Sequence, residues 1–399
     1  MLDSPAITPH DGTTSEALRR HLPLYLGEFL ILVANGIVFT AIAARALAAG
    51  LDTATIGLAG SAFYGGLFTT YLAGPLVLRL AGLRVMAAAA APLTAAGVAL
   101  LLVADPLVWL LGRYTMGLGI ALVFVTMENW LSLSVGPRRR GSVLGVYMAV
   151  FFGSYATGQA VLLVLPAASD AALLVAGACL FAGGLAMLAP MTAPRPHFSP
   201  RGEPALLAIL RHALPAIAAA LASGMVAGAF FALGPVYGLT IGLSERLVPW
   251  LLIAVVAGAS LTQLGLGLAA DRLDRRVLML VTCVTSAMAS IALAVADVAS
   301  LLVYALAVAW GATALTGYAV AAAIAYTAPH GRPPMEVARL LQTMNGIGGI
   351  LGPALASLLD GFAPGRGGFV LSIGVFAVLA LLVAADMAAR RRSGAGRRG

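Results

Sequence analysis

About twelve apolar runs of roughly 20 residues restrict the possible folds more than any other feature of this sequence. A helix of about 20 residues, rising about 1.5 Å per residue, crosses the roughly 30 Å hydrocarbon core of a bilayer. Of the 399 residues, 61% are hydrophobic and only 10% are charged, too few to cover a water-soluble domain. We therefore expect an all-α integral membrane protein. Its predicted transmembrane helices are 24–45, 55–78, 84–104, 107–132, 141–165, 171–190, 213–240, 247–270, 277–296, 299–324, 338–360 and 367–389.

The basic residues predict how these helices are oriented. All 24 of them are arginine, and the cytoplasmic loops of membrane proteins carry an excess of basic residues. If the N-terminus is cytoplasmic, twenty arginines fall on the cytoplasmic side and three on the opposite side, while Arg113 lies within a helix. We expect a multi-pass protein with both termini in the cytoplasm. The net charge of +8 then suits contact with anionic membrane lipid and requires no nucleic acid.

The chain divides into two halves of six predicted helices. A stretch rich in proline and arginine, 191–212, separates them, and proline excludes a continuous helix there. Each half contains an arginine followed thirteen residues later by a glycine, Arg140 and Gly153 in the first half, Arg339 and Gly352 in the second. The halves therefore resemble parallel repeats. The predicted organisation is a cytoplasmic tail (1–21), an N-terminal half (22–190), a cytoplasmic linker (191–212), a C-terminal half (213–389) and a basic cytoplasmic tail (390–399).

Three charged residues lie a full turn or more inside predicted helices, where such side chains are costly and usually face the bundle interior or a wet cavity. Arg113 and Glu128 share one helix, about 22 Å apart along its axis and about 60° apart around it, so they cannot pair directly. We assign Arg113 to the substrate or the gate. Glu128 and Glu28 are candidates for proton coupling, because a carboxyl in apolar surroundings can take up and release a proton. Alternatively, Arg113 extends to the headgroups and the glutamates contact loop arginines.

Two motifs resemble the major facilitator superfamily. The loop 267–276, GLAADRLDRR, is similar to its G-x-L-x-D-R-x-G-R-R motif, and the pattern RxxxGxGxA that begins at Arg113 is similar to its fourth-helix motif. The run ENWL at 128–131 resembles the YcaD-like bacterial branch. The loop between the second and third helices departs from the motif. Leu78 occupies its aspartate position, so Asp271 alone supplies that carboxylate.

This resemblance implies a fold of twelve transmembrane helices in two six-helix pseudo-repeats, with a cavity between the halves. It also implies that the first, fourth, seventh and tenth helices line this cavity. Polar and aromatic residues of these helices then join the candidate substrate site: Asn35, Tyr237, Trp310 and Tyr318. The alternative for these four residues is ordinary packing or hydrogen bonding between helices.

The resemblance further implies a cytoplasmic latch, in which Asp271 meets the start of the helix that Arg140 opens, across the boundary between the halves. A helix N-terminus carries partial positive charge and unpaired amides, which suit a carboxylate. Arg272, Arg275 and Arg276 share the loop with Asp271, and a solvated loop charge is the alternative. Small residues are expected to form a bending seam between the halves, or else static packing: Gly153, Gly158, Gly348, Gly352 and Pro353.

These features predict a secondary active transporter that moves a small molecule by alternating access, with proton-coupled export as one form. A uniporter or exchanger of the same fold, or a non-transporting membrane sensor or scaffold, remains an alternative. The sequence has no Walker loop and no serine, cysteine or metal constellation at catalytic spacing, so we expect no enzyme, cofactor or metal site. The resemblance implies a monomer in the bacterial inner membrane.

Overall fold

The computed structural model describes residues 14–103, 105–134, 140–188, 206–296, 301–327 and 334–395. Side chains are described within these ranges, except for those of 14–21, 75, 131–134, 140–145, 206–212, 263–272, 334–335 and 391–395. Every regular element in these ranges is a helix, which confirms the all-α prediction. The helices are α1 (Thr14–Ala48), α2 (Thr53–Leu100), α3 (Pro106–Ser134), α4 (Arg140–Val161), α5 (Asp170–Met187), α6 (Leu206–Thr240), α7 (Val248–Arg272), α8 (Arg275–Val295), α9 (Leu301–Ala314), α10 (Gly317–Thr327), α11 (Pro334–Asp360) and α12 (Gly367–Ala395).

These helices agree with twelve membrane passes, although their division differs from the prediction at two places. The predicted second and third transmembrane helices are joined in α2, which bends at Gly82, a glycine with a φ of 79°. This left-handed conformation is open to glycine because it has no Cβ. The predicted helix 299–324 is instead broken between α9 and α10. By length and composition, eight segments in the described ranges could each cross a membrane.

Polar caps and prolines set several helix ends. The Asp52 side chain accepts hydrogen bonds from the hydroxyl and the backbone N–H of Thr55, at 2.7 and 2.9 Å, and thereby caps α2. These bonds hold the pKa of Asp52 below its usual range. α6 starts inside the predicted linker and kinks at Ala213, two residues before Pro215, where proline interrupts the hydrogen bonds of the helix. The remainder of the linker, 191–205, lies outside the described residues.

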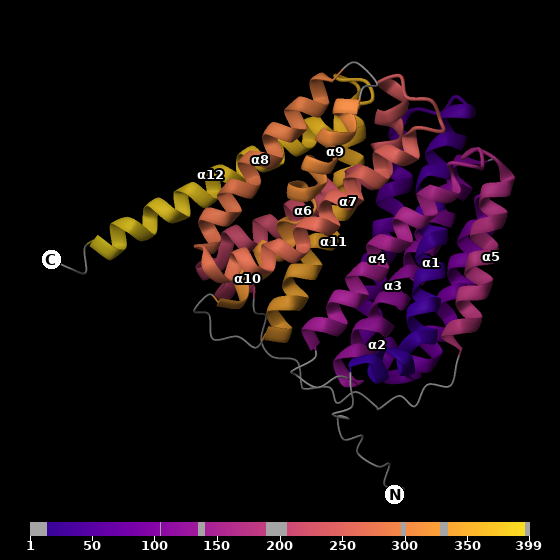
Figure 1. The fold of residues 1–399 in the computed structure, drawn as a ribbon, viewed down its shortest axis with the longest axis horizontal. Coiled ribbons are helices and arrows are strands. Elements are labelled where there is room, and N and C mark those ends of the chain that lie inside the picture. Colours follow the sequence, from indigo (N-terminus) through magenta and orange to yellow (C-terminus); the bar gives the residue numbers. More distant parts are fainter. Residues whose placement is uncertain are drawn as a thin grey trace, which may run out of the picture.

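The helices form two half-bundles that lie side by side, with α1–α5 in one and α6–α12 in the other (Figure 1). α2 with α11 and α4 with α7 make the main contacts between the halves, joined by α1 and α2 against α6. The short connections 49–52, 162–169, 241–247 and 361–366 lie at one end of the bundle, which we call the outer end because the arginine pattern predicts that it is outside. α1 begins at the opposite, inner end (Figure 1).

Small residues allow close approach of α2 and α11. The Ser61 hydroxyl of α2 donates a 2.7 Å hydrogen bond to the Ile350 carbonyl of α11. A Cβ added at Gly349 would overlap the ring of Tyr64, and one at Gly60 would lie 3.1 Å from Pro353. The two halves therefore meet there through backbone and small side chains, as small residues permit between membrane helices.

The glycine contacts predict that two of the seam glycines differ in their tolerance of a side chain. Gly352→Ala should lower the unfolding temperature of the purified protein, because its Cβ would overlap the Met225 carbonyl oxygen and overpacking costs about 1–3 kcal/mol. Gly153→Ala is the matched control. Its Cβ would meet no atom within 4 Å, so the unfolding temperature should stay constant or rise. Equal destabilisation by both changes would contradict the packing described for α11 and α6.

Candidate functional site

Arg113 is buried in the N-terminal half and has no acidic partner among the described residues. Its side chain is 1% exposed, and its guanidinium carbon lies 4.2 Å from the ring centroid of Phe39 and 4.4 Å from that of Phe63. One terminal nitrogen, Nη1, is 3.9 Å from the Met116 sulfur. Nε and Nη2 have no hydrogen-bond partner in the described structure. The cation is thus held between two aromatic faces, a favourable arrangement, while part of its hydrogen-bonding capacity is unused.

Aromatic rings from both halves lie beside Arg113. Phe231 of α6 lies 5.6 Å from Phe39 of α1 and 4.9 Å from Tyr155 of α4, measured between ring centroids. Phe39 and Phe231 each lie nine residues before the end of their helix, and Tyr155 lies six residues before the end of α4. We call Phe39, Phe63, Tyr155 and Phe231 the outer aromatic layer. Because Phe231 belongs to the C-terminal half and the other three to the N-terminal half, this layer joins the halves beside Arg113.

Two predicted substrate residues, Tyr237 and Trp310, lie within the packing of the C-terminal half. They are 2% and 1% exposed. The Tyr237 hydroxyl donates to the Leu293 carbonyl at 2.8 Å, and the Trp310 indole N–H donates to the Ser290 hydroxyl at 2.8 Å. Both rings contact Phe369 and line a small, mainly apolar pocket. The structure therefore does not bring these two residues together with Arg113, Glu28 or Glu128.

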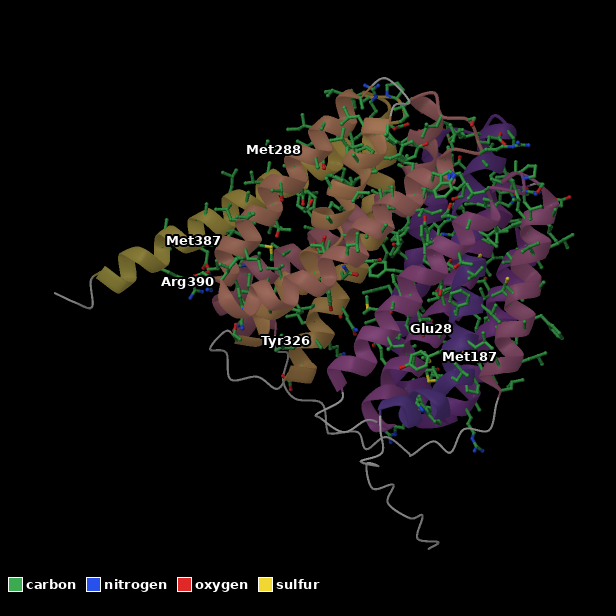
Figure 2. The ribbon with its side chains drawn as sticks, in the orientation of Figure 1. Glu28, Met187, Met288, Tyr326, Met387 and Arg390 are labelled. Atoms are coloured by element: carbon green, nitrogen blue, oxygen red, sulfur yellow. The ribbon has the colours of Figure 1, made fainter. Side chains whose placement is uncertain are left out.

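Glu28 is fully buried in α1 and lacks a partner. Its relative exposure is 0%, and neither carboxyl oxygen has a hydrogen-bond partner in the described structure. The nearby Tyr25 hydroxyl is also buried and unpartnered. In Figure 2, Glu28 lies within the N-terminal half, close to Met187 of α5. Burying an ionised carboxylate without a partner is so costly that such a group normally becomes neutral.

Glu128 lies between residues of the two halves. Its side chain is exposed, yet it accepts a hydrogen bond from Gln342 of α11 and interacts electrostatically with Glu28. Residues of both halves surround it, and four of them are tyrosines: Tyr71 of α2, Tyr147 of α4, and Tyr318 and Tyr326 of α10. A side chain that is accessible and has neighbours on five helices faces an internal space rather than lipid. Of the predicted site residues, Glu28, Glu128 and Tyr318 thus belong together.

Tyrosines on one face of α2 connect the two charged centres. Tyr64 interacts electrostatically with Arg113, and Tyr71 does so with Glu128 and with Tyr64. Residues seven apart lie on the same side of a helix, about 10 Å along its axis. Both side chains are half-buried. Sequence reasoning did not single out this pair. Its seven-residue spacing inside an apolar helix was the available signal.

The other interior amides have different surroundings. Asn35 is 9% exposed, and its side-chain oxygen has no partner in the described structure. Gln159 is fully buried, accepts from the Thr40 hydroxyl at 2.9 Å and donates to the Gly36 carbonyl at 2.7 Å. Gln159 therefore fastens α4 to α1, whereas Asn35 retains an unused acceptor.

The predicted latch is described only in part. The side chains of Asp271, Arg272 and Arg140 lie outside the described side chains, so the contact between this aspartate and α4 stays a prediction. The two other loop arginines bind within the C-terminal half. Arg275 donates to the Ala323 carbonyl of α10 at 3.3 Å, and Arg276 forms a 2.6 Å ion pair with Asp386 of α12. Asp386 also pairs with Arg390, near the end of α12 that projects from the bundle (Figure 2).

The predicted seam residues lie on three different contacts. Gly158 faces α1, where an added Cβ would be 2.6 Å from the Val33 carbonyl oxygen. Gly348 and Gly352 face α6, against Leu221 and Met225. Pro353 faces α2, and Gly153 faces open space. Pro353 is therefore the one seam residue among these whose described neighbours, at Gly57 and Gly60, include the opposite half.

Known structures confirm the twelve-pass architecture. The nucleoside transporter NupG (D323A mutant) superposes with a TM-score of 0.75 at 14% sequence identity, over 91% of this chain and 98% of that one. A bacterial homologue of the human lysosomal transporter Spinster superposes with a TM-score of 0.70 at 16% identity, over 94% and 96% of the two chains. At these identities the likeness concerns the fold. The fold and its interior charges define a polytopic helical membrane protein.

Sequence comparison then gives the family. The model of the Major Facilitator Superfamily matches residues 24–338 and 240–398, and the chain belongs to this superfamily. An uncharacterized MFS-type transporter of Enterobacter sp. (strain 638) is 26% identical over 346 residues, covering 85% of this chain and 88% of the relative. YcaD of Salmonella newport (strain SL254), also an uncharacterized MFS-type transporter, is 24% identical over 339 residues, covering 84% and 87%. The resemblance to the superfamily and to YcaD is thereby confirmed.

The contrast between Glu28 and Gln159 generates a stability prediction. Glu28→Met should leave the unfolding temperature unchanged or raise it, because an apolar side chain replaces a buried carboxyl that has no partner. Gln159→Leu is the matched control. It should lower the unfolding temperature, since the Thr40 hydroxyl and Gly36 carbonyl lose their partner, at about 1–3 kcal/mol for buried unsatisfied groups. A larger loss in Glu28→Met than in Gln159→Leu would contradict the surroundings described for Glu28.

Proposed function

We propose that this protein is a secondary active transporter that moves a small molecule by alternating access and couples the movement to protons. The observation that supports this most directly is the pair Glu28 and Glu128. One carboxyl is fully buried with no hydrogen-bond partner among the described residues, and the other is exposed and has neighbours in both halves. Two interacting carboxyls in such different surroundings suit proton uptake at one and proton storage at the other.

Tyr147 supplies a path between the two carboxyls. It is 6% exposed on α4 and interacts electrostatically with both Glu128 and Glu28. A phenol hydroxyl can donate and accept a hydrogen bond at once. In the proposed mechanism, Glu128 exchanges a proton with the inner opening and Tyr147 relays it to Glu28. Release then follows when the halves rock and the surroundings of α1 change.

For the two halves to rock, contacts between them must break at one end of the bundle while contacts between them form at the other end. The outer aromatic layer is the proposed outer gate, because Phe231 contacts Phe39 and Tyr155 across the boundary between the halves. The proposed inner gate is the Asp271 latch. The proposed bending region is the seam formed by Gly153, Gly158, Gly348, Gly352 and Pro353. Export is the direction we propose, with the opening around Glu128 facing the cytoplasm.

Uniport or exchange is the competing mode of transport, and a sensor that does not transport is the competing class. Uniport predicts flux that does not depend on a pH gradient. A sensor predicts that Arg113 and Glu128 can be replaced without loss of function. The buried, unpartnered Glu28 and Arg113 favour transport, because a static scaffold gains no stability from either group.

The flux prediction uses full-length protein in proteoliposomes with an imposed pH gradient and radiolabelled benzoate, tyrosine, uridine and tetraphenylphosphonium. At least one solute should move with the gradient, and its flux should fall by about tenfold or more in Glu28→Gln and in Glu128→Gln, because an amide cannot carry the proton. Glu245→Gln, at an exposed glutamate in the outer loop 241–247, is the matched control and should transport like the wild type. Flux that does not depend on the gradient, or that stays at the wild-type level in both site variants, would contradict proton coupling through these carboxyls.

The predicted orientation is tested with reporter fusions in bacterial cells. A fluorescent protein fused after Gly399 should fluoresce, and alkaline phosphatase inserted in the loop 49–52 should be active, because the arginine-rich loops remain in the cytoplasm. An active phosphatase fused after Gly399 would reverse the proposed orientation. It would also reverse the assignment of the inner and outer ends.

A further inference from the structure

The polar groups around Arg113 are donors that lack an acceptor. Nε and Nη2 of the guanidinium have no partner in the described structure, and the Tyr155 hydroxyl, on a side chain that is 6% exposed, has none either. Tyr155 and Tyr64 both interact electrostatically with Arg113. Three side chains from α2, α3 and α4 therefore bring N–H and O–H groups to one place in the interior. No carboxylate of the described residues pairs with Arg113.

This arrangement leaves a buried positive charge only partly compensated. The faces of Phe39 and Phe63 stabilise the cation, but they cannot accept in-plane hydrogen bonds from Nε and Nη2. A guanidinium presents its N–H groups as a planar fork that matches a carboxylate with two parallel bonds. The group missing from this site is therefore an anion with oxygen acceptors, and the adjacent Tyr155 hydroxyl is placed to donate a further bond to it.

The walls of the site indicate what else the anion carries. Phe39 and Phe63 enclose the guanidinium, Met116 contacts it, and Phe231 of the opposite half covers the layer from α6. Apolar and aromatic walls favour a ligand with an apolar body and few polar groups. Tyr64 and Tyr71 lead along α2 from this site toward the opening at Glu128. A small organic acid could thus reach Arg113 by way of half-buried phenol groups.

We propose that Arg113, with Tyr155 and Tyr64, binds the carboxylate of a small organic anion with an apolar or aromatic body, and that this anion is the transported substrate. The second part rests on the proposed transport function. In this arrangement Arg113 fixes the carboxylate, the outer aromatic layer contacts the apolar body, and Phe231 must move away from Phe39 and Tyr155 when the outer side opens. Glu28 and Glu128 remain available for protons, because the anion is held about 22 Å from Glu128 along α3.

The experiment is a binding measurement on the purified full chain in detergent, with three probes of matched shape: benzoate, benzamide and benzylamine. The shift of unfolding temperature with concentration gives a dissociation constant for each. Benzoate should bind at least tenfold more tightly than the other two. Arg113→Gln should weaken benzoate binding at least tenfold, and Tyr155→Phe about threefold. Arg45→Gln is the matched control, because Arg45 pairs with Asp170 near the outer end, and it should bind like the wild type.

Several outcomes would overturn the proposal. Equal binding of benzamide or benzylamine would show that the carboxylate is not recognised, and preferred binding of benzylamine would move recognition to Glu128. Absence of benzoate binding, or unchanged binding in Arg113→Gln, would remove Arg113 from the site. If Arg113→Gln does not fold, Tyr155→Phe and the three probes on the wild type still decide. Binding in detergent needs no gradient, so benzoate that binds but is never transported contradicts the transport function alone.

Discussion

The cost of an unpaired charge inside the membrane is the constraint on which the arrangement of this protein depends. Arg113 and Glu28 are both buried, and neither has an ion-pair partner among the described residues. Pairing them with each other would remove the cost, but they lie toward opposite ends of the N-terminal half. Arg113 is compensated locally by two aromatic faces, whereas a carboxyl buried in the way that Glu28 is buried normally avoids the cost by binding a proton.

The contacts between the two halves differ in kind from the contacts within each half, and this difference suits two sites whose charges are incompletely compensated. The boundary between α2 and α11 consists mainly of glycine, serine, proline and aromatic surfaces. Ion pairs of the described residues, such as Arg276 with Asp386, instead lie within one half. Weak, mostly apolar contacts between rigid halves allow rotation at low cost, whereas hydrogen bonds such as those of Gln159 keep each half intact. Stability within the halves and freedom between them thus come from different kinds of contact.

The sequence predicted the fold well because bilayer thickness translates directly into helix length. It failed where tertiary packing decides local conformation, since no pattern distinguishes a loop from the kink at Gly82 or signals the break between α9 and α10. For the candidate site, the cost of membrane charges identified Arg113, Glu28 and Glu128. The tyrosines at positions 64 and 71 were missed, and Tyr237 and Trp310 were grouped with the site, because helix membership alone does not fix the direction of a side chain.

The distribution of charge along α3 explains how one helix could serve two different steps. Arg113 lies beside the outer aromatic layer with two donor groups that have no partner among the described residues, and Glu128, toward the inner end, has Gln342 as a partner from the other half. About 22 Å separates them, too far for one small ligand to neutralise both. A solute bound at one end and a proton bound at the other can then be linked only through the movement of the halves. That linkage is what coupled transport requires, because neither site alone can drive the other.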